Sequence, residues 1–218
     1  MKEWLSNEDL ERIRQAVAEA ERLTSGEIVP YVVPRSDTYD GIAWKGAGIA
    51  AALALAFTAV VFQFYEGWGL GWLHTGWGTA TLALAAGIAG GVLSAFVPPI
   101  GRVLAGRECI IRTVHRRAMK AFVEEEVFAT RERTGVLIFV SLWEHRIEVL
   151  GDAGINARVS ADDWTDMVAR IRDGVRSGHF ADGLIDAIGM CGTLLEGSGV
   201  ERRDDDSNEL SDALRVES

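Results

Sequence analysis

The sequence has little cysteine and no recognisable secretion signal. Its two cysteines, Cys109 and Cys191, do not have a spacing typical of metal ligands or of a disulfide framework. The first ten residues are charged and helical in pattern, and they lack the apolar run followed by small residues that marks a signal peptide. We therefore expect the soluble part of the chain to lie in the reducing cytoplasm, with its two thiols free.

Sequence motifs of common hydrolases are also absent. The chain has no Gly-x-Ser-x-Gly, no Cys-x-x-x-x-x-Arg, no P-loop and no His-Glu-x-x-His pattern. Its four histidines are scattered along the chain. No nucleophile with a neighbouring activating base is visible, and this weakens a hydrolase interpretation.

Positive charge is scarce, because 22 Lys and Arg residues stand against 32 Asp and Glu residues, for a net charge of −10. Such an acidic chain is poorly suited to the phosphate backbone of nucleic acids, so we expect no nucleic-acid partner. Six of the basic residues gather in the segment 102–120, which contains a single acid, Glu108. They are Arg102, Arg107, Arg112, Arg116, Arg117 and Lys120.

Two long stretches contain no charged residue. They cover residues 46–65 and about 76–98, and each has the twenty or so residues that a helix needs to cross a bilayer. Because the connection is short, the two helices would be antiparallel neighbours, with Gly87 and Gly91 as a small-xxx-small pair between them. The sequence therefore predicts a transmembrane hairpin over residues 45–101, and a pair of buried helices in a soluble core is the alternative. Aromatic residues typical of the membrane interface lie at the ends of the two stretches: Trp44, Tyr65, Trp68, Trp72 and Trp77.

The distribution of basic residues predicts an orientation in the membrane. Lys45 precedes the hairpin and the basic segment follows it, whereas the loop over residues 66–75 has no Lys or Arg. By the positive-inside rule, we expect two spans in the inner membrane with both termini in the cytoplasm. Five arginines next to the membrane are expected to contact anionic lipids: Arg102, Arg107, Arg112, Arg116 and Arg117.

The remaining sequence predicts alternating helices and strands. A helix with an apolar face precedes an apolar strand at residues 27–33, and a second such helix covers residues 111–129. A β-hairpin is expected at residues 136–150, followed by two more helices. The final segment, residues 198–218, is polar and acidic and is expected to be disordered.

This order of elements resembles the TPM domain. Three segments carry the resemblance: residues 25–29, residues 131–155, and residues 176–184, where two helices meet at a Gly-x-x-x-x-Gly link. The resemblance implies an α/β fold with helices packed around a small mixed sheet, formed by residues 1–44 and 102–197. The chain is similar to a bacterial membrane branch of the family, with the hairpin inserted in the domain.

Some TPM domains are described as phosphatase-like or calcium-binding, which directs attention to carboxylates near strand and helix ends. Calcium prefers six or more oxygen ligands, and loops at one edge of the sheet could supply several. The simpler interpretation is that these acids cap helices, form turns and end a strand. The candidate metal ligands are Glu27, Asp152, Asp162, Asp163 and Asp166.

Three functions follow from these features. We favour a membrane-anchored interaction or scaffold module facing the cytoplasm, which contacts a protein partner through its basic segment and acidic tail. A metal-dependent phosphatase-like hydrolase and a calcium-binding domain without catalysis are the alternatives. Both alternatives rest on the family resemblance, since no nucleophile is recognised in the sequence.

Overall fold

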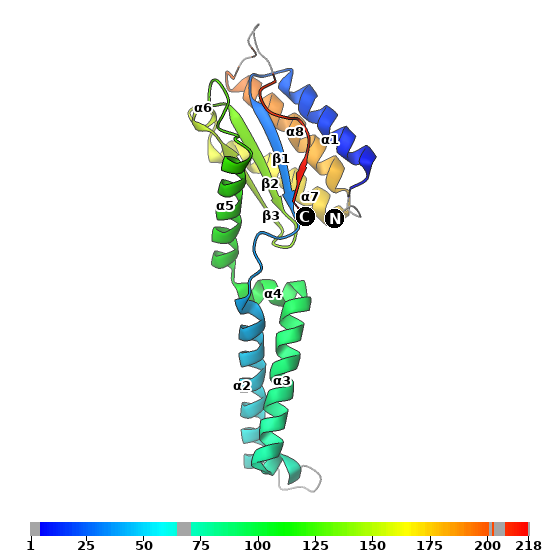
Figure 1. The fold of residues 1–218 in the computed structure, drawn as a ribbon, viewed down its shortest axis with the longest axis vertical. Helices are drawn as coiled ribbons and strands as arrows, with labels where there is room; N and C mark the ends of the chain where they lie inside the picture. The colour runs from blue at the N-terminus through cyan, green and yellow to red at the C-terminus, as the bar shows by residue number, and fades with distance from the viewer. Residues whose placement is uncertain (1–4, 65–70, 201, 203–207, 218) are drawn as a thin grey trace. The chain divides into compact units, whose positions relative to one another are not determined.

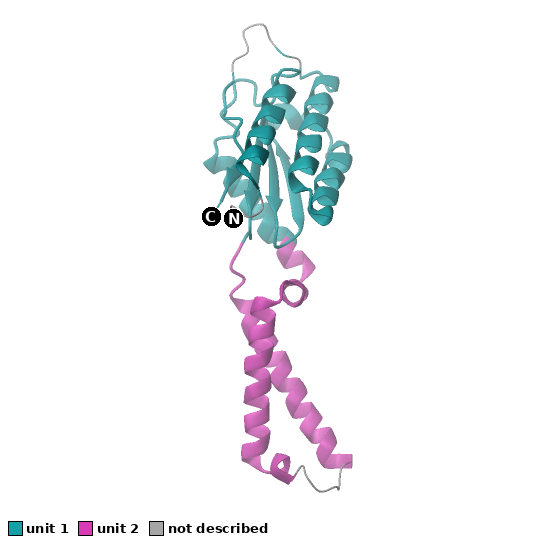
Figure 2. Ribbon diagram, turned by 90° about the vertical axis from the view of Figure 1, so that its right-hand side faces the viewer, with its two compact units in different colours: residues 1–36, 111–218 teal, residues 37–110 magenta. Residues whose placement is uncertain are grey.

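The computed structural model describes residues 5–64, 71–200, 202 and 208–217. The chain forms two compact units (Figure 2). Unit 1 consists of Met1–Ser36 together with Ile111–Ser218, and unit 2 consists of Asp37–Ile110. The apolar hairpin thus belongs to a unit of its own, and residues distant in the sequence join to form unit 1.

Unit 1 is built on a mixed sheet with the strand order β3-β2-β1-β4 (Figure 1). β1 (Glu27–Val33) and β2 (Gly135–Ser141) run parallel, and every residue of both strands is buried. Continuous apolar runs suit strands that are covered on both faces. β3 (Arg146–Gly151) returns antiparallel to β2, and β4 (Arg215–Val216) pairs in parallel with β1. The predicted α/β class with a small mixed sheet is confirmed.

Helices cover both faces of this sheet (Figure 1). The helices over one face are α1 (Asn7–Glu21), α7 (Thr165–Ser177) and α8 (Phe180–Gly197). They pack together and share a core with Ile28, Val32 and Ile138 of the sheet. α5 (Arg107–Glu124) lies over the opposite face, toward which the alternate residue Tyr31 points. The helices of unit 1 are α1 (Asn7–Glu21), α5 (Arg107–Glu124, in this unit from Ile111), α6 (Ala153–Asn156), η2 (Ala161–Trp164), α7 (Thr165–Ser177) and α8 (Phe180–Gly197).

The C-terminal segment corrects one prediction. Residues 198–218 were expected to be disordered, but the described part of this segment packs on the sheet. The Glu217 N–H donates to Val32 O at 3.1 Å, and the N–H groups of Glu209 and Leu210 donate to the Glu27 carboxylate at 3.0 and 3.1 Å. The acidic composition indicated solvation, but these tertiary hydrogen bonds do not depend on composition.

Unit 2 is an antiparallel pair of long helices. α2 (Gly41–Phe64) and α3 (Gly76–Phe96) are both long and apolar enough to cross a membrane. η1 (Gly71–His74) precedes α3, and α4 (Pro98–Ala105) follows it. α3 ends before Pro98, and this proline then occupies the first position of α4. Tyr65 and Trp68, predicted at the membrane interface, lie outside the described residues.

Small residues allow α2 and α3 to approach closely. A Cβ atom at Gly46 would lie 2.7 Å from Gly90 O, and a Cβ atom at Gly90 would lie 2.4 Å from the Cβ of Ala50. Neither position therefore tolerates a side chain without movement of a helix. The predicted pair, Gly87 and Gly91, also faces α2: Cβ atoms at these positions would lie 3.4 and 3.3 Å from backbone oxygens of α2.

Glycines also allow the close approach of α7 and α8 and the turn between them. Gly178 ends α7 with φ +77°, a conformation that favours glycine. A Cβ atom on Gly183 would lie 2.9 Å from both Gly174 Cα and Arg170 O, so the two helices touch through their backbones. These contacts account for the glycines in segment 176–184.

Replacing Gly183 by alanine is expected to destabilise unit 1. The new methyl group would meet backbone atoms that cannot move independently, and we expect a loss of about 1–3 kcal/mol in the free energy of unfolding. Gly189→Ala is the matched control on α8, because nothing lies within 4 Å of its Cβ position. Chemical denaturation of the two variants measures the difference. Equal stability of the two variants would contradict the close packing.

Candidate functional site

One end of the sheet gathers two of the five predicted metal ligands. Glu27, at the start of β1, is paired with Gly135, at the start of β2. The Asp152 N–H, just after β3, donates to Gly135 O at 2.9 Å. The strand register thus brings Glu27 and Asp152 to the same end of the sheet, on either side of β2.

Both carboxylates are buried and engaged by the protein itself. Glu27 accepts the backbone hydrogen bonds of Glu209 and Leu210 described above. Asp152 caps α6 by accepting from the Ala153 N–H at 2.7 Å. It also forms an ion pair with Arg133, with Nε 2.6 Å from Oδ2. A metal ion at this end would therefore compete with internal donors for the oxygens.

The other three predicted ligands are exposed and serve the start of α7. Asp163 accepts hydrogen bonds from the backbone and side chain of Ser160, both at 2.7 Å, and the side-chain bond is the main cause of its lowered pKa. Asp162 and Asp166 lie beside it in the first turns of η2 and α7. Across the part of the chain that the structure describes, no group of three or more His, Cys, Asp or Glu side chains could hold a metal ion.

Glu21 also lies at this end of the sheet, which we call the acidic end after Glu21, Glu27 and Asp152. The sequence did not reveal its environment. It accepts a hydrogen bond from the Ile28 N–H at 2.9 Å and lines a cavity of about 110 Å³ together with Glu27 and Asp212. Burial, followed by the charges of these two acids, raises the pKa of Glu21 to about 8. Its position at the end of an amphipathic helix gave no sign of this environment.

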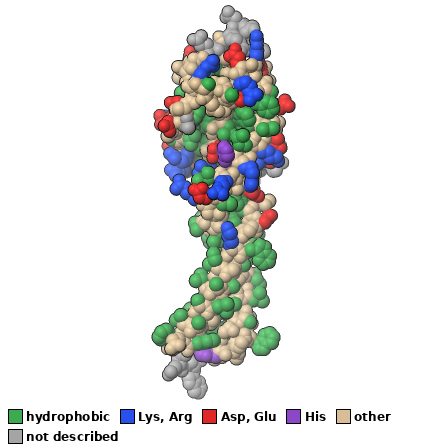
Figure 3. Space-filling view, turned by 90° about the vertical axis from the view of Figure 1, so that its left-hand side faces the viewer, with side chains coloured by type: hydrophobic (Ala, Val, Ile, Leu, Met, Phe, Trp, Pro, Cys, Tyr) green, Lys and Arg blue, Asp and Glu red, His purple; other side chains and the backbone are tan. Residues whose placement is uncertain are grey.

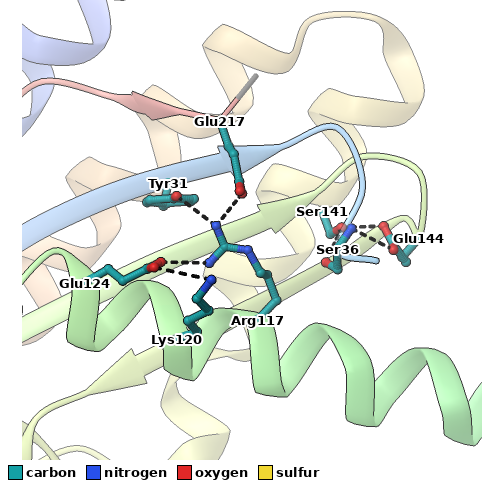
Figure 4. A network of polar contacts seen from close by, with 8 residues as sticks. All are labelled: Tyr31, Ser36, Arg117, Lys120, Glu124, Ser141, Glu144 and Glu217. Carbon is teal, nitrogen blue, oxygen red and sulfur yellow. Dashed lines mark hydrogen bonds and ion pairs between the residues drawn. The ribbon is translucent and has the colours of Figure 1, made fainter. Parts of the chain in front are cut away.

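The opposite end of the sheet holds a buried hydroxyl and carboxylate cluster (Figure 4). Ser141, the last residue of β2, donates to the Glu144 carboxylate, and its Oγ lies 2.8 Å from Ser36 Oγ. The Ser36 N–H donates to the same carboxylate at 2.9 Å. These bonds fasten the segment after β1 to the turn between β2 and β3. Ser141 and Glu144 are 1% and 4% exposed, so we interpret the cluster as structural.

A basic cavity of about 370 Å³ adjoins this cluster. His145 lines it from the β2–β3 turn and Arg146 from the start of β3, and Arg172 and Arg176 line it from α7. These residues come from separate elements, so the sequence does not bring them together. The spacing of Arg172 and Arg176 by four residues was the one available signal, because such residues share a helix face.

Arg117 corrects part of the predicted lipid contact. It was expected to face anionic lipids, but its side chain is 12% exposed and points to the sheet (Figure 4). There it pairs with Glu217 and donates to Tyr31 Oη at 3.2 Å. The helical periodicity of α5 turns Arg117 toward the sheet and leaves Arg112 and Arg116 exposed, which a count of basic residues does not reveal.

Removing the charge of Glu21 is expected to change the pH dependence of stability. Because its folded-state pKa of about 8 exceeds the ordinary 4.5, its contribution is fully present below about pH 4.5 and is lost as the pH rises through about 8. Glu21→Gln should match the wild type near pH 5 and be more stable near pH 8 by on the order of 1–3 kcal/mol. Melting curves at both pH values measure this. Glu19→Gln, an exposed substitution on the same helix, is the control, and equal effects of the two would contradict the assignment.

Comparisons with known proteins agree with this architecture. The TPM domain family matches residues 107–194, which run from α5 into α8. An NMR structure of the BA42 protein from the psychrophilic bacterium Bizionia argentinensis is similar, with a TM-score of 0.59 and 22% sequence identity, over 98% of this chain and 95% of that chain. A search among curated proteins finds no match. The chain therefore contains a TPM domain at residues 107–194 and shares its fold with BA42.

Proposed function

We propose that the α2–α3 hairpin anchors this protein in a membrane and that unit 1 is an interaction module on the cytoplasmic side. One observation carries the proposal: only 6% of the apolar window in α2, and 11% of that in α3, is buried within the protein. A core helix of a soluble protein would be mostly buried. Exposed apolar surface of this extent is stable in lipid and costly in water.

The side chains of unit 2 support a lipid environment. Leu53 and Ile88, on the two helices, are 66% and 61% exposed. Trp44 and Trp77 are more than 80% exposed and lie in the first turns of α2 and α3, positions that suit the membrane interface. Hydrophobic side chains are spread over unit 2, whereas charged side chains concentrate on unit 1 (Figure 3).

The orientation follows from the basic residues that flank the hairpin. Lys45 lies in the first turn of α2 and donates to Leu104 O at 3.3 Å, so the chain segments entering and leaving the hairpin are tied together. Arg107 and Arg112, exposed on α5, are available for anionic headgroups. The connecting segment 66–75 has no Lys or Arg. The positive-inside rule then favours a cytoplasmic unit 1.

A binding role for unit 1 is favoured over hydrolysis because the acidic end is occupied by internal contacts. Asp152 holds Arg133 and caps α6, and Glu27 holds the C-terminal segment. A calcium or phosphatase function would require these contacts to open. A rise in melting temperature with added Ca²⁺ that is lost in Asp152→Asn would favour that alternative over the present proposal.

Cysteine labelling of intact spheroplasts is expected to show the predicted orientation. Among the described residues, no atom lies within 4 Å of the Cβ position of Gly71, so we expect a Gly71→Cys variant in a Cys109→Ser background to be tolerated. A membrane-impermeant maleimide should label it without permeabilisation. In the wild-type protein, the exposed Cys109 should be labelled only after permeabilisation. The second natural cysteine, Cys191, is buried.

Alkaline extraction of the same membranes provides an independent check. The protein should remain in the membrane pellet, as expected for a chain with spanning helices. Labelling of Gly71→Cys only after permeabilisation, or release of the protein by alkali, would contradict the proposal.

A further inference from the structure

We propose that the basic cavity next to the β2–β3 turn binds a phosphate group carried on a small apolar body. The cavity lies entirely within unit 1. The inference therefore does not depend on where the protein resides, and it concerns the opposite end of the sheet from the predicted metal ligands.

The charges around the cavity favour an anion. Arg146, Arg172 and Arg176 all line it, and none of the lining residues that the structure describes is acidic. Within the described part of the chain, neither Arg172 nor Arg176 has an ion-pair or hydrogen-bond partner. Arg146 reaches Glu148 only at 3.8 Å, and its buried Nε has no hydrogen-bond partner among the described residues. The cavity thus gathers two guanidinium groups that have no partner among the described residues and a third whose ion pair is long, and a bound dianion would reduce the repulsion among them.

The type of charge favours phosphate. Guanidinium groups present planar pairs of N–H donors that match phosphate oxygens, and such charge-assisted hydrogen bonds are the stronger class. Arg172 and Arg176 are four residues apart on α7 and so project from one face, while Arg146 comes from the neighbouring strand β3. An anion seated between α7 and β3 could contact donors from both elements.

The shape and lining of the cavity favour an apolar body attached to the phosphate. Val140, Ile147 and Val175 also line the cavity. Its volume of about 370 Å³ exceeds the need of an isolated phosphate and falls in the range of small-molecule sites. A mainly apolar wall with a few convergent charges is the usual composition of such sites.

Helix electrostatics explain only part of this arrangement. Arg176 lies in the last turn of α7, where a cation is stabilised by the helix dipole. Arg172 lies one turn earlier, and Arg146 is on a strand, so the dipole does not account for them. A purely structural role would predict no saturable ligand binding, which separates the two explanations.

Titration of the detergent-solubilised full-length protein with phenyl phosphate tests the inference. We expect saturable binding by calorimetry and a rise in melting temperature that sodium chloride at equal ionic strength does not reproduce. Arg172→Gln should weaken binding by about tenfold or more, because it removes a charge-assisted contact. Arg170→Gln is the matched control: this arginine is exposed on α7 and does not line the cavity.

Competition with a short-chain phosphatidic acid identifies the source of the phosphate. Displacement of phenyl phosphate by the lipid at lower concentration would assign a lipid headgroup, and weaker competition would assign a soluble phosphate ester; either result supports the site. Absence of saturable binding by both probes in the millimolar range would overturn the inference. Equal weakening by Arg170→Gln and Arg172→Gln would overturn it as well, since it would reveal a general effect of charge.

Discussion

The parallel pairing of β1 with β2 is the constraint on which the rest of the structure depends. The two strands pair over seven residues each and are buried along their whole length. The pairing joins segments that are separated by about a hundred residues in the sequence. The connection between parallel neighbours is a crossover, and here it contains both the apolar hairpin and α5. Two antiparallel helices bring the chain back to the end of the hairpin at which it entered. The inserted hairpin therefore still allows β1 and β2 to pair. A single membrane span at this point would separate β1 from β2.

The two units satisfy hydrophobic burial in different ways. Unit 1 buries its apolar residues between the sheet and its helices, whereas unit 2 directs them outward and packs through small residues such as Gly46 and Gly90. Ion pairs in unit 1 tie its distant parts together. Arg117 on α5 holds Glu217 after β4, and Arg133 holds Asp152 after β3. Both pairs include a mostly buried member, so loss of one partner would be costly.

Features that depend on the local sequence could be predicted, whereas features that depend on tertiary contacts could not. The charge-free hairpin and the apolar strand β2 were readable because length and composition define them. β4 was missed because a two-residue strand has no pattern of its own and depends on contacts such as Glu217 with Arg117. The environment of Glu21 and the gathering of Arg146 with Arg172 arise only when separate elements meet.

We propose that unit 1 folds as a domain by itself and that the crossover between β1 and β2 carries a membrane hairpin. The most direct test replaces residues 37–105 with a flexible Gly-Ser linker and measures solubility and unfolding in the absence of detergent. We expect a soluble protein that unfolds cooperatively, because the exposed apolar surface of α2 and α3 has been removed while the β1–β2 pairing remains. A variant that stays in solution only with detergent, or that lacks a cooperative transition, would contradict it.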